Sequence, residues 1–264
     1  MNVLVVQDIS KEFKGELLST LAIERLDFKI KQREFVSIVG PSGCGKTTLL
    51  MIIAGLLTPS AGNIAVQGKI VSGPPEGLVL LFQDYSRSLL PWRNVIENVC
   101  YGMELKRQKI PRGDILPRAE KYLEAVGLSG FADHYPWQLS GGMQQRVAIA
   151  RALACEPSIL VMDEPFASVD AQTRAELEDT LLGIWEKFQQ TILFVTHDID
   201  ESIYLSDRVL VLRDRPSVIM DDVTVDIPRP RTQLETRNCE VFLSYRTKIH
   251  KMIIQEDAGK THEV

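Results

Sequence analysis

The sequence predicts an α/β fold whose sheet is mostly parallel, and two observations carry this prediction. Apolar runs short enough to be buried strands recur along the chain, and stretches of helical character separate them. Strands that alternate with helices form parallel sheets with helices on both faces. With 264 residues, 45% of them hydrophobic, the chain can bury the core of one sizeable domain.

The elements follow from local signals, taken in chain order. Apolar, β-rich runs predict strands at residues 3–6, 26–30, 35–39, 78–82, 158–162, 191–195 and 209–212. A glycine-rich turn follows the third run, and a helix is expected over residues 46–57. Residues 84–154 have a more polar, helical pattern, and residues 170–189 carry an apolar stripe at helical spacing. The composition changes after about residue 221, which indicates an accessory extension.

Composition and charge restrict the classes of function. The formal net charge is −5 and the pI about 5.5, which argues mildly against a protein that binds duplex nucleic acid. No apolar run approaches the ~18 residues that cross a bilayer, and the first residues do not have the pattern of a signal peptide. Widely spaced cysteines without a CxxC pair indicate reduced thiols in the cytosol: Cys44, Cys100, Cys155 and Cys239.

A phosphate-binding loop is predicted where the third strand run ends. The pattern G-x-x-x-x-G-K-[ST] is satisfied by Gly40, Pro41, Ser42, Gly43, Cys44, Gly45, Lys46, Thr47 and Thr48. Glycines let backbone N–H groups turn toward phosphate oxygens at a helix N-terminus. The Lys46 ammonium can then contact the β- and γ-phosphates, and the Thr47 hydroxyl can ligate Mg²⁺. The alternative is a structural glycine-rich turn, against which the preceding strand and following helix argue.

A later apolar strand ends in two carboxylates, Asp163 and Glu164. In a parallel sheet, ligands bind at the C-terminal ends of the strands. Asp163 would hold Mg²⁺ through its water shell, and Glu164 would be the base that polarises the attacking water. A solvated acidic turn is the alternative for this pair.

A second anion site is predicted at residues 139–146, which read LSGGMQQR and precede a helical stretch. Ser140, Gly141 and Gly142 would offer exposed N–H groups at the positive end of a helix dipole. One phosphate needs only one cradle, so this second cradle is expected to cap the γ-phosphate held by a partner chain. A serine N-cap followed by two loop glycines is the alternative.

Taken in order, these motifs resemble those of the ATP-binding cassette (ABC) ATPases over roughly residues 1–220. The resemblance includes Gln83 and a lone His197 that follows a strand. It implies a P-loop NTPase core with a mostly parallel sheet, an antiparallel β part at the N-terminus and an inserted α-helical subdomain. The implied single ABC domain spans residues 1–220. Its RecA-like core comprises residues 1–83 and 155–220, and its helical subdomain comprises about 84–154. Residues 221–264 form the C-terminal extension.

The resemblance implies roles for further residues. Gln83 would contact Mg²⁺ and the attacking water, Asp170 would communicate across a dimer, and His197 would hold the γ-phosphate. Taken singly, Gln83 could be a surface residue, Asp170 a helix N-cap and His197 a structural residue. Phe13 fits the place where the family presents an aromatic ring to adenine, although a core phenylalanine is the alternative. Arg33 departs from the family, which usually has glycine there.

Two classes of function stay open: the energising subunit of a membrane importer, and a soluble ABC ATPase for cofactor assembly or other macromolecular work. The segment from Gln83 to Val99 is similar to that of bacterial importers for nitrate, sulfonates and taurine, where it forms the groove for a permease helix. Here Leu89, Leu90 and Trp92 would offer an apolar socket. Arg87 and Arg93 would lie at its rim. Ordinary packing of the helical subdomain is the alternative.

The resemblance therefore leads us to expect an ATPase that uses ATP and Mg²⁺ and closes head-to-tail on a second copy or a homologous subunit. Its catalytic residues would be Glu164, His197 and Gln83. It would sit peripherally on the cytoplasmic face of the inner membrane and energise permease subunits. A solute-binding protein would be an indirect partner, and no nucleic acid is expected.

Overall fold

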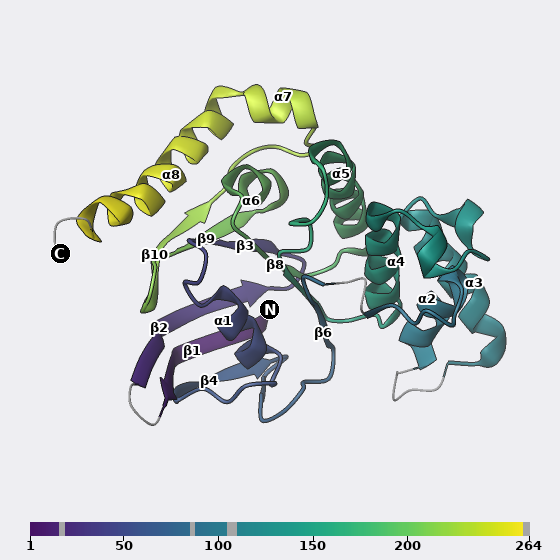
Figure 1. Cartoon of the computed structure of the whole chain (residues 1–264), viewed down its shortest axis with the longest axis horizontal. Coiled ribbons are helices and arrows are strands. Elements are labelled where there is room, and N and C mark those ends of the chain that lie inside the picture. The colour runs from purple at the N-terminus through teal and green to yellow at the C-terminus, as the bar shows by residue number, and fades with distance from the viewer. Residues whose placement is uncertain (16–18, 85–87, 105–109, 261–264) are drawn as a thin grey trace.

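The sheet is the framework of the molecule. The computed structural model describes residues 1–15, 19–84, 88–104 and 110–260. Within these residues, ten strands form one sheet in the order β5-β4-β1-β2-β10-β9-β3-β8-β7-β6 (Figure 1). The strands are β1 Asn2–Lys14, β2 Ser19–Lys31, β3 Phe35–Val39, β4 Ala61–Val66, β5 Lys69–Ile70, β6 Leu78–Leu81, β7 Ile159–Asp163, β8 Ile192–Thr196, β9 Arg208–Leu212 and β10 Ser217–Thr224.

The sheet has an antiparallel part and a parallel part. β1 pairs antiparallel with β2 and β4, and β4 pairs antiparallel with β5. In the parallel part, β7 pairs with β6 and β8, and β3 pairs with β8 and β9, all in parallel. β10 joins the two parts, because it pairs antiparallel with β9 and parallel with β2. The α/β fold expected from the sequence, with its antiparallel N-terminal part, is confirmed.

Helices cover both faces of the parallel part, as Figure 1 shows. Short 3₁₀ turns occur at Ser129–Phe131 and Pro136–Gln138. The α-helices are α1 Lys46–Ile53, α2 Val95–Glu104, α3 Arg112–Ala125, α4 Gly141–Ala154, α5 Ala171–Phe188, α6 Ile199–Leu205, α7 Gln233–Asn238 and α8 Glu240–Lys260. Helices α2, α3 and α4 pack on one another beside β6, within the segment expected to be the helical subdomain.

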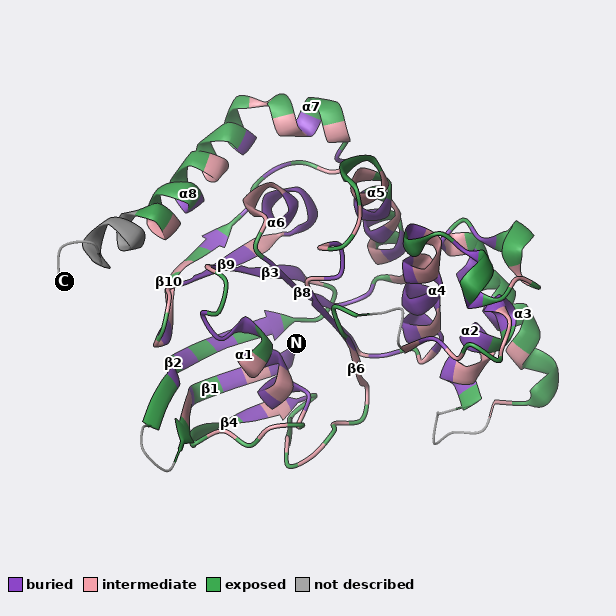
Figure 2. Cartoon of the chain, in the orientation of Figure 1, coloured by how far each residue is buried: buried purple, intermediate pink, exposed green. Residues whose placement is uncertain are grey.

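Alternating side chains of the parallel strands supply two hydrophobic cores, one on each face of the sheet. Val36, Ile38 and Val161 pack with α1 and the antiparallel strands, whereas Phe35 and Phe194 pack with α4, α5 and α6. Figure 2 shows the buried side chains concentrated along these strands and on the inner sides of the helices. Because both faces are covered, β3, β7 and β8 are buried throughout, which explains their largely apolar sequences.

The C-terminal segment packs on the core. Phe242 and Ile249 of α8 belong to the core cluster on the α5 and α6 side. Arg246 forms an ion pair with Asp200 of α6, and Lys248 Nζ lies 2.7 Å from Asp221 Oδ2. Strand β10 crosses the boundary expected at residue 220, so the change in composition does not coincide with the end of an element.

Two turns contain residues with a left-handed backbone conformation. The helix expected over 46–57 ends at Ile53, where Gly55 takes a left-handed conformation with φ 68°. Arg33, at the position where glycine is usual, also has a left-handed φ of 66°. The usual glycine at this turn therefore has a conformational reason, and the departure in sequence leaves the turn intact.

Candidate active site

The phosphate loop joins β3 to α1. Gly43 and Gly45 have φ values of 80° and 108°, a region that favours glycine. A Cβ on Gly40 would lie 2.8 Å from the Leu212 carbonyl oxygen, so the first glycine is needed for close packing on β9. The Cys44 N–H donates to the Pro41 carbonyl, which closes a tight turn ahead of α1. The loop can thus present backbone donors to an anion at this helix N-terminus.

The other loop residues divide between core and surface. Cys44, Gly45 and Lys46 are buried, whereas Ser42 and Thr47 are exposed, and Pro41 and Thr48 are half-buried. Desolvation raises the pKa of the Cys44 thiol. The hydroxyl groups that the loop places at its surface are therefore those of Ser42 and Thr47.

Lys46 points back into the loop that carries it. Its Nζ donates to the Gly40 carbonyl at 2.9 Å and to the Pro41 carbonyl at 3.0 Å, and it lies 3.7 Å from Glu164 Oε1. The side chain is only 5% exposed. A buried ammonium held by neutral carbonyls is well placed to exchange them for phosphate oxygens.

Adjacent parallel strands bring the catalytic candidates together. β7 pairs with β8 so that Asp163 lies opposite Val195, and the Glu164 N–H donates to the Val195 carbonyl at 2.9 Å. His197, one residue beyond β8, places Nδ1 3.1 Å from Glu164 Oε2. Glu164 itself has φ 43°, a conformation that costs energy for a residue other than glycine and that clusters at functional sites.

Asp163 and Thr47 form a candidate site for Mg²⁺. Asp163 is buried, and desolvation raises its pKa, while the hydrogen bond from the Thr47 side chain acts in the opposite direction. A carboxylate and a hydroxyl are hard oxygen donors, which suit Mg²⁺ with waters and phosphate oxygens completing its shell. Within the described part of the chain, no group of three or more His, Cys, Asp and Glu side chains could hold a metal by itself.

Gln83 lies on the same edge of the sheet. β6 pairs with β7 so that Leu81 is opposite Met162, and Gln83 follows Leu81 by two residues, exposed to solvent. This places it beside the strand end that carries Asp163. Residues 85–87 of the expected segment, including Arg87, lie outside the described residues.

Ser140, Gly141 and Gly142 lie elsewhere in the chain. Ser140 is the N-cap of α4, and its Oγ accepts a hydrogen bond from the Met143 N–H at 3.3 Å. A Cβ on Gly142 would lie 2.5 Å from Thr173 Cγ2, so α5 closes that side. In Figure 1, α4 stands with α2 and α3, apart from α1. The structure therefore does not bring this second cradle to the phosphate loop of the same chain.

Asp170 is the N-cap of α5, as one of the two interpretations expected. Its carboxylate accepts hydrogen bonds from the N–H groups of Gln172 and Thr173 and from the Thr173 hydroxyl. The Thr173 contacts, its N–H first, lower the pKa of Asp170. The residue is exposed, so its remaining oxygen surface faces outward beside the Gly142 cradle.

Phe13 is a surface residue, so the interpretation as a core phenylalanine is wrong. It is 43% exposed on β1, with Lys11 Nζ 5.1 Å from its ring centroid. β1 is near the phosphate loop, because Lys11 pairs with Ile23 of β2 and a Cβ on Gly45 would contact that part of β2. The exposed ring is therefore available to a ligand that extends from the loop.

Several residues around the site were not anticipated from the sequence. Arg174 donates to the Val169 carbonyl at 3.3 Å, and its Nη1 lies 3.5 Å from Asp198 Oδ2. Arg174 and Asp198 line a small pocket together with Glu164 and His197. Glu201 lines the same pocket, and burial raises its pKa to about 8. No local sequence pattern predicts that a single charged residue of a helix, such as Arg174 or Glu201, will line this pocket.

Arg215 is a further contact of the phosphate loop that the sequence did not indicate. Its Nε donates to the Gly43 carbonyl at 2.5 Å. Gln145 of α4 donates to the Pro165 carbonyl, directly after Glu164. The two contacts tie the phosphate loop to the β9–β10 turn, and the start of α4 to the loop that carries Glu164.

The segment expected to form a permease groove is only partly available on the surface. Leu89 is buried in the core, which corrects its expected place in an apolar socket, and Leu90 is half-buried. Trp92 is 71% exposed. Asn98 holds the turn that displays it, by hydrogen bonds to the backbone of Leu90 and Arg93.

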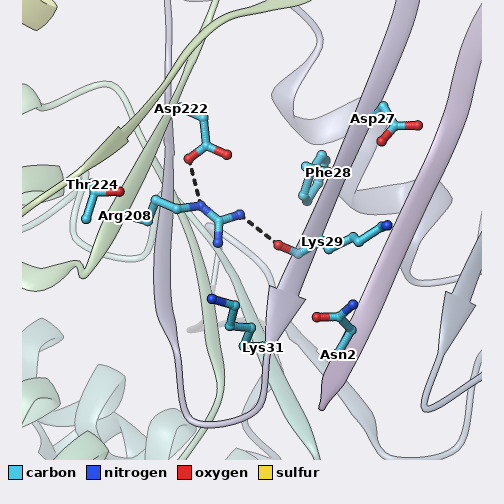
Figure 3. Close-up of a pocket in the computed structure, with 8 residues that line it drawn as sticks. All are labelled: Asn2, Asp27, Phe28, Lys29, Lys31, Arg208, Asp222 and Thr224. Atoms are coloured by element: carbon cyan, nitrogen blue, oxygen red, sulfur yellow. Dashed lines mark hydrogen bonds and ion pairs between the residues drawn. The ribbon is translucent and has the colours of Figure 1, made fainter.

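Another concavity lies at the opposite end of the strands. Figure 3 shows it between β2 and the β9–β10 pair, with Arg208 held by Asp222 and the Lys29 carbonyl. Arg208 lies opposite Val36, at the amino end of β3, whereas the phosphate loop follows its carboxyl end. This pocket is therefore separate from the candidate active site. It is lined by Asn2, Asp27, Phe28, Lys29, Lys31, Arg208, Asp222 and Thr224.

Comparisons with known proteins agree with this geometry. The family model described as ABC transporter matches residues 23–167. An uncharacterized ABC transporter ATP-binding protein of Methanocaldococcus jannaschii is 48% identical over 96% of this chain and 92% of its own length. The nitrate import ATP-binding protein NrtD of Synechocystis sp. is 39% identical over 99% of this chain and 98% of its own length.

A solved structure adds a likeness in three dimensions. It is a dimeric ATP-binding cassette in a post-hydrolysis state, bound to ADP and Pi; it is 30% identical, has a TM-score of 0.72 and covers 85% of this chain and 100% of its own. Among the described residues of our chain, the helices are all too short or too polar to span a membrane. The chain thus belongs to the ABC transporter family as an ATP-binding protein, and it is an enzyme that hydrolyses ATP.

Proposed function

We propose that this ATPase acts as a head-to-tail pair of chains, with each ATP between the phosphate loop of one chain and the Ser140–Gly142 cradle of the other. The observation that carries the proposal is that one chain holds two helix N-termini suited to anions, at α1 and at α4, in separate parts of the fold. The solved relative is a dimer bound to ADP and Pi, which supports a nucleotide-bound pair of chains.

Within each site the residues would divide the work. Lys46 would leave the carbonyls of Gly40 and Pro41 for the phosphates, and the ATP-bound Mg²⁺ would be held by Thr47, Asp163 and Gln83, where it supplies positive charge. Glu164 would accept a proton from the attacking water. His197, already hydrogen-bonded to Glu164, would orient that carboxylate and approach the γ-phosphate.

The same closure explains why nucleotide would hold two chains together. Negative phosphate charge is satisfied on both sides only when the cradle with Ser140 meets the loop with Lys46. Asp170, exposed beside that cradle, would contact the facing chain. Hydrolysis and loss of phosphate would then reopen the pair, which is either a homodimer or a dimer with a homologous subunit.

The work of this cycle would be solute import. Trp92 stands exposed on a turn held by Asn98, as an anchor for a permease helix would. The likeness to a nitrate import ATP-binding protein supports a small solute such as nitrate. The resemblance of the segment from Gln83 to Val99 extends the proposal to a sulfonate or taurine. The chain would then lie peripherally on the cytoplasmic face of the membrane, with a solute-binding protein as an indirect partner.

An interchain crosslink tests the two-chain site. In a chain with Ser42→Cys and Ser140→Cys, we expect oxidation to join two chains only when ATP and Mg²⁺ are present, because both serines are exposed and would face each other across the nucleotide. Chains with either substitution alone are the matched controls, since each also contains the native cysteines. A crosslink that forms equally without ATP, or none at all in the double variant, would contradict the sandwich.

A further inference from the structure

Two stacked aromatic rings stand on the surface immediately before the Ser140 cradle. The ring centroids of Tyr135 and Trp137 are 4.6 Å apart, with 14° between their planes. Trp137 is 64% exposed, although side chains of this size are usually highly buried. One face of the indole lies on Tyr135, and its exposure leaves the other side open to a ligand.

The segment that carries these rings is held rigidly against α4. Pro136 is buried, and its carbonyl accepts a hydrogen bond from Gln144 Nε2 of α4 at 2.9 Å. The Tyr135 N–H donates to Gln138 Oε1 at 2.7 Å. Such fixed aromatic side chains lose little conformational entropy when they bind a partner.

The surroundings of the Ser140–Gly142 cradle decide on which side a bound nucleotide can extend. On one side Gly142 is closed by Thr173 of α5. Ser140 and Gly141 are exposed, and so are Trp137 and Gln138 shortly before them. Trp137 is three residues from Ser140, so their Cα atoms are within about 10 Å. A nucleotide whose γ-phosphate rests in the cradle can therefore extend over the indole.

We propose that Trp137, backed by Tyr135, stacks on the adenine of the ATP that the partner chain holds. The inference rests on the proposed two-chain site and adds a contact for the base. A purine has two faces, and Phe13, exposed near the phosphate loop, can cover only one of them. The open face of Trp137 covers the second. Stacking is tolerant of base identity, so this contact adds affinity without selecting adenine from other bases.

The test measures ATP-driven dimerisation in the Glu164→Gln chain, in which hydrolysis is blocked. Because the symmetric dimer holds two nucleotides and loses both contacts, Trp137→Ala should weaken dimerisation about 30- to 20,000-fold, twice the free energy that stacking of one base on one ring supplies. Trp137→Phe should recover most of the loss. The matched control is Phe131→Ala, because Phe131 is also exposed and paired with a ring, His134, but lies nine residues before Ser140.

A second measurement separates this contact from one within a single chain. In a Ser140→Arg chain, which cannot close the sandwich, Trp137→Ala should leave the affinity of the monomer for ATP unchanged. A loss of that affinity, or normal dimerisation of the Trp137→Ala chain, would overturn the inference. Normal dimerisation with lost retention on permease membranes would assign the ring to the permease surface and also overturn it.

Failure of the proposed function would look different. If the Glu164→Gln parent itself forms no ATP-dependent dimer, the two-chain site is wrong and the stacking contact falls with it. Fluorescence reports the contact directly when Trp92 and Trp185 are replaced by Phe and Trp137 is the single tryptophan. We expect ATP to quench this emission in step with dimerisation. Emission that does not change when the dimer forms would exclude the contact.

Discussion

His197 Nδ1 lies 3.1 Å from Glu164 Oε2, although the two residues are 33 positions apart in the sequence. The neighbouring strands β7 and β8 end side by side and deliver the two side chains to one edge of the sheet. The other oxygen of the same carboxylate, Oε1, faces Lys46 Nζ at 3.7 Å. Glu164 is therefore oriented from two sides before any nucleotide is bound.

Glu164→Gln keeps the shape of this side chain but removes the base. We expect the variant to bind Mg-ATP and to hydrolyse it at least about a hundredfold more slowly, because a positioned base contributes typically 10²–10⁴. In the presence of ATP, the variant should also accumulate as a dimer, which a sizing column detects. Phosphate release at the wild-type rate would show that Glu164 is not the base.

Lys46→Ala should act on nucleotide affinity. The Lys46 ammonium is the buried cation of the phosphate loop, and its loss also leaves the Gly40 and Pro41 carbonyls without this donor. We expect ATP binding, measured by calorimetry, to weaken by at least about tenfold, since hydrogen bonds to charged groups contribute about 1.5–3 kcal/mol. Lys69→Ala, exposed on the edge strand β5, is a control for the loss of one positive charge. Equal affinities in Lys46→Ala and wild type would remove Lys46 from the site.

Trp92→Ala tests the surface for the permease. A buried aromatic anchor at an interface contributes about 2 kcal/mol or more, so its loss should weaken assembly by more than tenfold. The isolated subunit should bind ATP normally, because Trp92 lies on the turn that Asn98 holds, and not on the phosphate loop. The measurements are retention on membranes that contain the permease, and solute uptake. Leu116→Ala, another exposed apolar residue, is the matched control. A wild-type protein that shows no membrane retention with its permease present would defeat the importer function.

Glu201→Gln should change how stability depends on pH. Burial raises the pKa of Glu201 from its ordinary value of 4.5 to about 8, with Glu178 and Asp198 acting in the same direction and Thr196 and Arg174 against it. Folding then takes up a proton between these values, so the free energy of unfolding falls as pH rises from about 5 to 8.

Glutamine stays neutral across this range. The stability of Glu201→Gln relative to wild type should therefore increase with pH, by about 1 kcal/mol or more, as each pKa unit corresponds to 1.36 kcal/mol. Urea unfolding at pH 5 and pH 8 measures the difference, with the exposed Glu186→Gln as a control. A difference that stays constant with pH would mean that Glu201 is ionised in the folded chain.

The sequence alone determined the fold class and the chemistry of most of the candidate site. Patterns of adjacent residues carry this information, since G-x-x-x-x-G-K-[ST] specifies a loop conformation and an apolar strand followed by Asp163 and Glu164 specifies where two carboxylates end. The apolar stripe at 170–189 likewise predicted α5, whose Leu177, Leu181 and Ile184 are buried. These signals are local, so no tertiary contact was needed to read them.

Only the tertiary structure decided which residues meet. Leu89 and Trp92 are similar in sequence terms, yet packing buries the first and displays the second. Glu201 and Arg174 reach the pocket beside His197 because α5 and α6 converge there, and no local pattern records that convergence. The separation of Ser140 from the phosphate loop is likewise a property of layers and strand order. Burial and distance depend on contacts between remote segments, and those contacts form only when the sheet and its helices assemble.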